Sequence, residues 1–434
     1  MLILPKYLNS IVVGIDVASE FSFAAILCPD GSQYRKPFRF EHSAAGFNYL
    51  LDQIKKVEKE FSMKPVFFME STGVYHLTLF HFLKDNKFEA LVINPLVTNS
   101  NKNKSIRKVK NDRNDALSIA RLGKYEDIKV SSDSDLNIFT LKLLVRDYYK
   151  LIDSRTTFKK KLSTTLSIAF CGYHNVFSDI CGQVSIGILE KFPSPQAVLS
   201  APKQEVVDIL LLSRKGISWA EKKYQKLVEC AENARFVGFA TSRLSISISS
   251  NLTLYRSIEA EAHRLMYEIK EFINSPDMPP ALQSNIKLLT SIPGIGYSSA
   301  ITIIAEIGSL DKFITSKQLV AFFGVDPAVN ESGNFKGDRV KMSKRGTRFG
   351  RRALYAAALA SIRTKRNGQA INPVLLKYYQ ENLKGKKPKV ALVAVMHKLI
   401  KYIFAVLKNQ QEFQIREPKL HQQMFLENRS RLAC

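Results

Sequence analysis

The chain has 434 residues, of which 45% are hydrophobic, so it is long enough for about two or three globular domains and too apolar to be disordered. Its 64 Lys and Arg exceed its 39 Asp and Glu, and the net charge of +25 favours a polyanionic partner. The N-terminus has no acylation signal and the apolar runs fall short of the roughly 18 residues of a membrane span, so we expect a soluble protein that binds nucleic acid rather than a membrane.

Three consecutive segments near the N-terminus have the composition of β-strands. Residues 11–17 form a β-branched run, and residues 21–27 form a second apolar run. The turn Pro29–Gly31 leads to a third, alternating segment at residues 38–40. Short runs of this kind, separated by turn residues, predict three antiparallel strands.

Helix and strand patterns then alternate along the chain. The predicted elements are a helix over 47–61, a strand over 66–70, a helix over 74–86, a strand over 88–93 and a helix containing 116–122. A mixed sheet with three antiparallel strands first, followed by parallel strands joined by crossover helices, is what a ribonuclease-H-like fold requires. We therefore predict an α/β ribonuclease-H-like domain over residues 1–130.

The remainder of the chain has mainly helical patterns. Residues 131–285 predict a helical connector, which is either a coiled coil or ordinary helix packing within one subunit. Residues 286–411 predict a second compact, mainly α domain, and residues 412–434 a polar tail. The order of domains is therefore α/β, helical connector, mainly α domain and tail.

Four acidic residues occupy positions where an α/β domain of this kind would place a metal site. Asp16 interrupts the first apolar strand, and Glu70 ends the fourth. Asp112 and Asp115 lie three apart at the start of a helix and share one face. Carboxylates that hold two Mg²⁺ ions come from different elements whose ends converge, as these do. Helix capping by Asp112 or Asp115 and solvation of Glu70 are the alternatives.

A serine and a dense basic segment mark the second domain. Ser332 precedes Gly333 on a predicted turn, and no His lies between His263 and His397. From the residues alone Ser332 is more typical of a turn serine than of a nucleophile. The cations that follow predict contacts with a phosphate backbone: Lys336, Arg339, Lys341, Lys344, Arg345, Arg348, Arg351 and Arg352.

The segment around Gly294 and Gly296 indicates a helix-hairpin-helix. Such a turn presents backbone amides that hold a DNA phosphate without reading sequence, although Pro-Gly also serves as a plain helix connector. The five cysteines are scattered, which predicts free thiols in a reducing cytoplasm. Cys171, His174 and Cys181 supply three ligands of no common zinc spacing, so buried thiols are the favoured interpretation.

Two sets of motifs, in order along the chain, resemble the DEDD transposases of the insertion-sequence 110 family. The first set comprises Val13–Val17, Glu70–Tyr75, Asn94–Pro95 and Lys110–Ala116, and the second comprises Ser291–Gly296, Phe323–Pro327, Glu331–Gly333 and Ser343–Gly346. The departures are Asn111, where the family usually has Thr, and Phe323 or Val325, where it has Leu.

The resemblance implies a RuvC-like catalytic domain, a serine-bearing transposase domain, and an RNA-guided recombinase. In that family a noncoding bridge RNA pairs with donor and target DNA. Asp16, Glu70, Asp112 and Asp115 match the DEDD residues that hold Mg²⁺, and Ser332 matches the serine that forms a covalent phosphoserine link to DNA, with Ser343 as the fallback candidate. The implied assembly is a homo-oligomer, a dimer or a tetramer, in a prokaryotic cytoplasm near the nucleoid.

Two other functions remain open at the level of the sequence. A RuvC-like, metal-dependent nuclease that resolves branched DNA would use the same carboxylates with Ser332 in a structural role. A non-catalytic nucleic-acid-binding protein would need only the basic residues.

Overall fold

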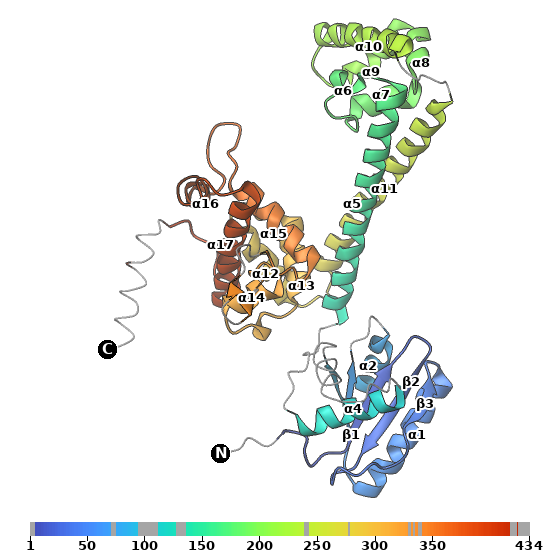
Figure 1. Cartoon of the computed structure of the whole chain (residues 1–434), viewed down its shortest axis with the longest axis vertical. Coiled ribbons are helices and arrows are strands. Elements are labelled where there is room, and N and C mark those ends of the chain that lie inside the picture. The colour runs from blue at the N-terminus through green and yellow to red at the C-terminus, as the bar shows by residue number, and fades with distance from the viewer. Residues whose placement is uncertain are drawn as a thin grey trace. The chain divides into compact units, whose positions relative to one another are not determined.

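The computed structural model of the chain describes residues 5–70, 75–93, 112–126, 136–237, 243–276, 278–328, 331–332, 335–336, 341–416 and 423. The chain divides into two compact units, Met1–Ser134 and Asp135–Cys434 (Figure 1). The first contains a mixed sheet, and the second is mainly helical.

The first unit is built on a five-stranded sheet in the order β3-β2-β1-β4-β5. The strands are β1 (Val12–Val17), β2 (Phe21–Leu27), β3 (Phe38–Glu41), β4 (Val66–Glu70) and β5 (Glu89–Ile93). β1, β2 and β3 pair antiparallel, whereas β1, β4 and β5 pair parallel. This confirms the predicted mixed sheet and its order of strands.

Helices cover both faces of this sheet because β1 and β4 are apolar on both sides, as expected for strands buried between layers. Val13, Ile15 and Val17 share a core with α1 (Ala44–Phe61) and α2 (His76–Asp85). Val12 and Phe68 share a second core, on the opposite face, with α4 (Asp112–Tyr125). The two-residue period of β1 therefore places Gly14 and Asp16 on the α4 side.

Close contact with α4 explains the glycine within β1. A Cβ atom on Gly14 would lie 2.2 Å from the Ala120 nitrogen and 2.3 Å from the Ala116 oxygen, so only glycine lets the helix backbone approach. At the far end of the helix, the Lys124 ammonium donates to the Ser10 carbonyl at 2.8 Å, just before β1 begins. The helix α4 thus runs antiparallel to β1, and its first turn lies at the carboxyl end of the strand.

The second unit contains two hydrophobic cores joined by a pair of long helices, α5 (Leu136–Ala169) and α11 (Leu244–Asn274) (Figure 1). Leu141 of α5 and Ile269 of α11 belong to one core, and Leu166 and Ile248 to the other. The two helices are therefore antiparallel. An ion pair between Arg155 and Glu259 at 3.1 Å joins their middle sections.

One of the two cores belongs to a helical insert, the part of the chain that lies between α5 and α11 in sequence. It consists of α6 (Tyr173–Val176), α7 (Gln183–Lys191), α8 (Pro195–Ser200), α9 (Lys203–Leu211) and α10 (Ile217–Val237). Within the predicted connector, residues 131–285, the structure thus has a folded helical cluster as well as the long helix pair.

The other core belongs to the C-terminal region, whose helices and connecting loops supply the core residues and which also includes the short hairpin that carries the predicted serine. Its elements are α12 (Pro280–Thr290), α13 (Tyr297–Ile307), η1 (Leu310–Lys312), α14 (Ser316–Phe322), β6 (Glu331–Ser332), β7 (Phe335–Lys336), α15 (Arg348–Ser361), α16 (Pro373–Lys377), η2 (Tyr378–Asn382) and α17 (Pro388–Asn409). Of the predicted tail, only residues 412–416 and 423 are among the described ones.

The last helix corrects the expectation that no apolar segment approaches the length of a membrane span. By length and composition α17 could cross a membrane, because 18 consecutive residues of it have a mean hydropathy of 1.9. Half of that stretch is buried inside the second unit. Val395, Leu399 and Ile403 are fully buried there, which is the pattern of a core helix.

A buried ion pair fastens α13 to α5 in this core. The Arg146 guanidinium donates to both carboxylate oxygens of Glu306, at 2.7 and 2.9 Å, and the Lys142 ammonium lies 3.5 Å from the same carboxylate. The Glu306 side chain is 1% exposed. Its burial acts to raise the pKa, but Arg146, Lys142 and Thr347 outweigh burial and lower the pKa below its ordinary value.

Candidate active site and nucleic-acid interface

Asp16 and Glu70 lie side by side at the carboxyl ends of two parallel strands. The register of β1 and β4 pairs Val12 with Val66 and continues to Ile15 with Met69, so the next residues are Asp16 and Glu70. Both carboxylates are half-buried. Because neighbouring residues of parallel strands point to the same face, both belong to the side that α4 covers.

Asp112 and Asp115 reach the same end of the sheet from the first turn of α4. Asp112 precedes Ala116 by one helical turn, and Ala116 contacts β1 at Gly14. The Arg113 guanidinium lies 5.8 Å from the ring of Phe23, the residue of β2 that pairs with Asp16. The first turn of α4 therefore lies over the part of the sheet that carries Asp16.

The carboxylates share one end of the sheet but are not gathered around one point. Among the residues that the structure describes, no group of three or more His, Cys, Asp or Glu is close enough to hold a metal ion. Asp16 and Asp115 each interact with another group. Carboxylate oxygens are the ligands that Mg²⁺ prefers, so the residue types suit this ion, and three separate elements supply them. The neighbouring motif residues 71–74, 94–95 and 110–111 lie outside the described ranges.

Ser332 lies in a short β-hairpin. It ends the two-residue strand β6 and pairs with Phe335 of β7. An isolated bridge between Pro327 and Met342, with a 2.7 Å bond from the Ala328 N–H to the Lys341 carbonyl, closes the base of the hairpin. The Ser332 side chain is outside the description. The backbone of Ser332 forms the second residue of β6, and residues 333–334 lie outside the described ranges.

Ser343, the fallback candidate, lies beneath this hairpin and is engaged with Asp326. Its hydroxyl donates to Asp326 Oδ1 at 2.5 Å, and its backbone N–H donates to the Asp326 carbonyl at 2.8 Å. The Ser343 side chain is half-buried. These two bonds join the two segments that lead into and out of the hairpin.

The loops beside Ser343 pack closely through two glycines and one arginine. Gly324, at φ +61°, leaves room where a Cβ would lie 2.5 Å from the Gly346 nitrogen. The Arg351 guanidinium donates to the Phe323 carbonyl at 2.9 Å and to the Gly346 carbonyl at 3.3 Å. Burial lowers the pKa of Arg351. His397 Nε2 donates to the Val325 carbonyl at 2.8 Å, which completes a fixed base for the hairpin.

The structure separates the predicted phosphate-binding cations into two groups. Two arginines are engaged within the protein. Arg351 donates to the loop carbonyls described above, and Arg352 pairs with Asp153 at 2.6 Å and lies over the ring of Tyr149. The other described side chains are exposed and have no ion pair with a carboxylate in the described part of the chain: Lys341, Lys344, Arg345 and Arg348. Lys336 is described by its backbone alone, and Arg339 lies outside the described residues.

The predicted helix-hairpin-helix turn joins α12 to α13, and its two glycines face different surroundings. Gly294 has φ +107°, and a Cβ there would lie 1.9 Å from Ser361 Oγ. The Ser361 hydroxyl and the Asn372 amide both donate to the Pro293 carbonyl, at 3.1 and 3.2 Å. A Cβ on Gly296 would meet nothing within 4 Å. Gly294 therefore docks the turn onto α15, and Gly296 is on its open side.

The cysteines form no metal site in the described residues. His174 Nε2 lies 3.4 Å from the Ser163 hydroxyl. The predicted burial of Cys171 and Cys181 is wrong: Cys171 is exposed and Cys181 half-exposed, because both lie at the surface of the helical insert. Cys28 and Cys230 are buried free thiols. Sequence patterns also missed the cavity around Trp219 in the helical insert, because its lining comes from two segments that are far apart in sequence.

Two family models match the parts of the chain that carry the four acids and the two candidate serines. Residues 13–171 match a DEDD transposase model of IS110, described as a transposase. Residues 286–380 match a model described as the transposase family of IS116, IS110 and IS902. The four acids lie in the first match, and Ser332 and Ser343 lie in the second.

Known relatives align with parts of the chain. An insertion element IS110 protein of Streptomyces coelicolor is 23% identical over 53% of this chain and 53% of its own length. The transposase of IS1111A from Coxiella burnetii is 34% identical over 28% of this chain and 33% of its own length. A pilin gene-inverting protein of Moraxella bovis is 26% identical over 35% of this chain and 44% of its own length. The chain thus spans about half the length, or less, of these relatives.

Proposed function

Since the chain belongs to the IS110 family of transposases, we propose that it mobilises an insertion sequence by exchanging DNA strands under the guidance of a noncoding bridge RNA. The observation that carries this proposal is the adjacency of Asp16 and Glu70 at the carboxyl ends of β1 and β4, with Asp112 and Asp115 on the helix above. The strand order supports a ribonuclease-H-like, RuvC-like domain. The printed names of the relatives, a transposase and gene-inverting proteins, agree with DNA rearrangement.

The four carboxylates would hold Mg²⁺. The bound ion would stabilise the negative charge that develops on the phosphate during transfer. Half-burial of Asp16 and Glu70 keeps these side chains in a surrounding of reduced dielectric, where interactions with a cation are stronger than in water. Capping of α4 by Asp112 or Asp115 is compatible with this role.

Ser332 would act as the nucleophile. Its oxygen forms a bond to the DNA phosphorus, the bond from phosphorus to a deoxyribose oxygen breaks, and the departing oxygen takes up a proton. The resulting phosphoserine keeps a phosphodiester, so the hydroxyl of a second strand can replace serine without an external energy source. The bond from Ser343 to Asp326 supports a structural role for Ser343 and favours Ser332 as the reacting residue.

DNA would be held mainly by charge. Lys341, Lys344, Arg345 and Arg348 are exposed cations close to the base of the hairpin, and the open space beside Gly296 leaves room for a phosphate. These contacts position DNA without reading its sequence, so target choice rests with the guide RNA. Strand exchange needs at least two active sites, which implies a homo-oligomer, a dimer or a tetramer, in the cytoplasm of a prokaryotic cell and at its nucleoid.

The decisive experiment seeks the covalent intermediate. The purified chain is incubated with Mg²⁺, element-end DNA and the candidate RNA, and the digested protein is searched by mass spectrometry for a nucleotide adduct. We expect the adduct on Ser332, its absence in Ser332→Ala, and its persistence in Ser343→Ala.

Other outcomes would contradict the proposal in distinct ways. An adduct on Ser343 would reassign the nucleophile. Cleavage of branched DNA without any adduct, dependent on Asp16, would indicate a RuvC-like resolvase. Nucleic-acid binding that survives in Asp16→Ala, with no strand cleavage in either protein, would indicate a non-catalytic binding protein.

A further inference from the structure

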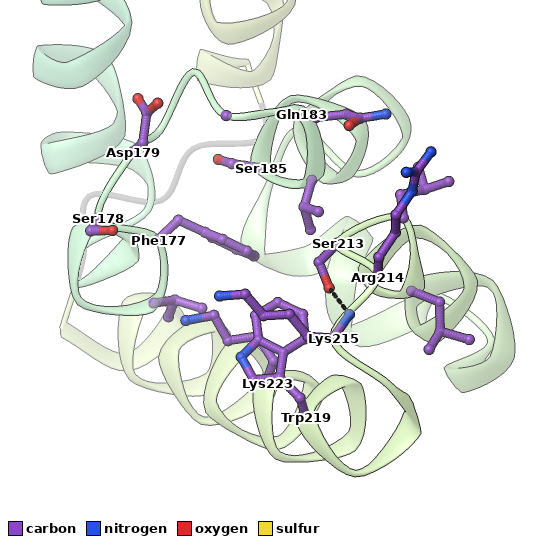
Figure 2. A pocket seen from close by; sticks show the side chains of 15 residues that line it. Phe177, Ser178, Asp179, Gln183, Ser185, Ser213, Arg214, Lys215, Trp219 and Lys223 are labelled. Carbon is purple, nitrogen blue, oxygen red and sulfur yellow. Dashed lines mark hydrogen bonds between the residues drawn. The ribbon is translucent and has the colours of Figure 1, made fainter. Parts of the chain in front are cut away.

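A cavity of about 670 Å³ lies in the helical insert of the second unit. Two segments line it: one runs from Phe177 through the loop before α7 into its first turn at Ser185, and the other runs from the end of α9 at Leu211 into α10, which carries Trp219 and Lys223 (Figure 2). The cavity residues lie between the two stretches matched by the family models, which end at residue 171 and begin at residue 286. The cavity thus belongs to a part of the chain to which the family models assign nothing.

The cavity has an aromatic wall. Trp219, the only tryptophan of the chain, is half-buried there, and Phe177 beside it is buried. The Lys215 ammonium lies 5.0 Å from the centre of the Trp219 ring, and the Lys223 ammonium lies 5.8 Å from the same ring and 5.2 Å from that of Phe177. Figure 2 shows the two lysines beside the indole.

The charges around this wall are unbalanced. In the described part of the chain, Arg214, Lys215 and Lys223 form no ion pair with a carboxylate. The one acidic residue of the lining, Asp179, already accepts from the Lys159 ammonium at 2.8 Å. Burial, together with the positive charges of Lys226 and Lys215, lowers the pKa of Lys223. The aromatic wall is therefore bordered by cations that repel one another and attract an anion.

The backbone presents these cations by a tight turn. Arg214 has φ +57° and Gly216 has φ +83°, and the Arg214 N–H bonds to the Leu211 carbonyl at 2.9 Å. The Lys215 N–H bonds to the Ser213 hydroxyl at 3.4 Å (Figure 2). A left-handed arginine is uncommon, and its place here turns Arg214 and Lys215 toward solvent at the cavity mouth.

We propose that this cavity binds an unpaired base of a single-stranded nucleic acid, stacked on Trp219, with the flanking phosphates held by Arg214, Lys215 and Lys223. Stacking on an aromatic ring beside cations is how single strands are bound without regard to sequence. The volume lies in the usual range for small-ligand sites, about 300–1,000 Å³, and suits one nucleoside. Bases inside an intact duplex are already stacked and cannot enter, so the site selects single strands.

The single tryptophan makes the proposal directly testable with the full-length protein. Trp219 fluorescence is titrated with a 12-nucleotide RNA, with the DNA strand of the same sequence, with the corresponding DNA duplex, and with a strand that lacks bases. We expect the two single strands to quench the fluorescence, and the duplex and the abasic strand to leave it unchanged. The ratio of the RNA and DNA affinities then identifies the natural source of the base.

Variants separate this site from the basic surface elsewhere. Binding of the same strands to Lys215→Gln and Lys223→Gln is followed by the same quenching, and each substitution is expected to weaken it about 10-fold, with a larger effect when both are combined. Lys203→Gln is the matched control, because Lys203 lies over the ring of Tyr224 in the same insert but faces Glu221 at 3.9 Å. Circular dichroism checks that each variant is folded.

Three results would overturn the proposal: no quenching by any single strand, equal quenching by the abasic strand, or quenching by an acidic peptide with none by nucleic acid. The assay needs neither DNA cleavage nor the Ser332 adduct. Its failure therefore leaves the proposed recombination untouched, and failure of the recombination leaves the stacking site untouched.

Discussion

The acidic end of the sheet and the serine hairpin are held in place by different kinds of structure. Asp16 and Glu70 are fixed by the register of two buried parallel strands, and Asp112 and Asp115 by a helix that packs on one of those strands. Ser332 is carried by a two-residue strand that stands on loops. The carboxylates thus depend on a packed core, whereas the serine depends on hydrogen bonds among loop residues. In the proposed function, the residues that would hold Mg²⁺ therefore lie on a packed sheet and helix, and the serine that would attack DNA lies on a short hairpin.

The largest effect should follow from removing a charge at the rigid site. We expect Asp16→Asn to lower the rate of strand exchange about 10³-fold. Asn keeps the shape of the side chain but not the negative charge that holds a cation. Asp52→Asn is the control, because Asp52 is an exposed carboxylate of α1 on the other side of the sheet. A full rate in Asp16→Asn, measured with element-end DNA, would remove Asp16 from the catalytic set.

A second prediction tests whether helix packing fixes that site. Gly14→Ala places a methyl group 2.2 Å from the Ala120 backbone, so we expect it to destabilise the first unit by about 3 kcal/mol. Gly296→Ala meets nothing within 4 Å and should change stability by less than about 0.5 kcal/mol. Hydrogen exchange of the β1 and α12–α13 amides measures both. Equal protection in wild type and Gly14→Ala would show that α4 does not pack as described.

A third prediction concerns the ion pair that supports the serine-bearing core. Arg146→Met leaves Lys142 as the one cation beside the buried Glu306 in the described residues, and we expect a loss of about 2 kcal/mol, below the usual loss for a broken buried pair because Lys142 remains. The control is Arg264→Met, which removes an equally well-aligned but exposed pair with Glu261 and should change stability by less than about 0.5 kcal/mol.

The same pair predicts a direction of pH dependence. The folded pKa of Glu306 lies below its ordinary value of 4.5, so the ion pair stabilises the fold fully above that pH. Its contribution is lost as the pH falls through the lower, folded pKa. The difference in unfolding free energy between wild type and Arg146→Met should therefore shrink on acidification. A difference that grows toward low pH would contradict this assignment.

The smallest effect is expected at the basic surface, where it distinguishes two kinds of cation. Lys344→Gln should reduce the slope of log binding constant against log salt concentration by about 0.9, because one phosphate contact is lost. Arg352→Gln should leave the slope unchanged, since its guanidinium already pairs with Asp153. The slopes come from DNA titrations at several salt concentrations. Equal changes in both variants would contradict this division.

The parts of the fold that depend on neighbours in sequence were predictable. The β-branched run at Val12–Val17 and the helical spacing within Ala44–Phe61 predicted a strand of the sheet and its covering helix, and the apolar surroundings of Asp16 marked it as unusual. The internal roles of Arg351 and Arg352 were not predictable. Their partners, the Phe323 carbonyl and Asp153, are 28 and 199 residues away, and no local pattern distinguishes a paired arginine from a free one.

The cavity of the insert escaped sequence analysis for a similar reason. Phe177 follows α6 and Trp219 lies in the first turns of α10, 42 residues further along the chain, and either alone is an ordinary apolar residue. Only the folding of α6 to α10 brings them together. For the four carboxylates, the sequence predicts that their elements meet at one end of the sheet, and the structure places the elements there. It does not bring three of the carboxylates into one group among the described residues.

The antiparallel pair α5 and α11 also sets a length scale. With 34 residues, α5 extends about 50 Å, and it carries one core of the second unit near each end. This distance equals about 15 base pairs of duplex. A nucleic acid bound at both proposed sites, in the serine-bearing region and in the insert, must span that distance. The length of the helix pair therefore sets the separation of the two contacts.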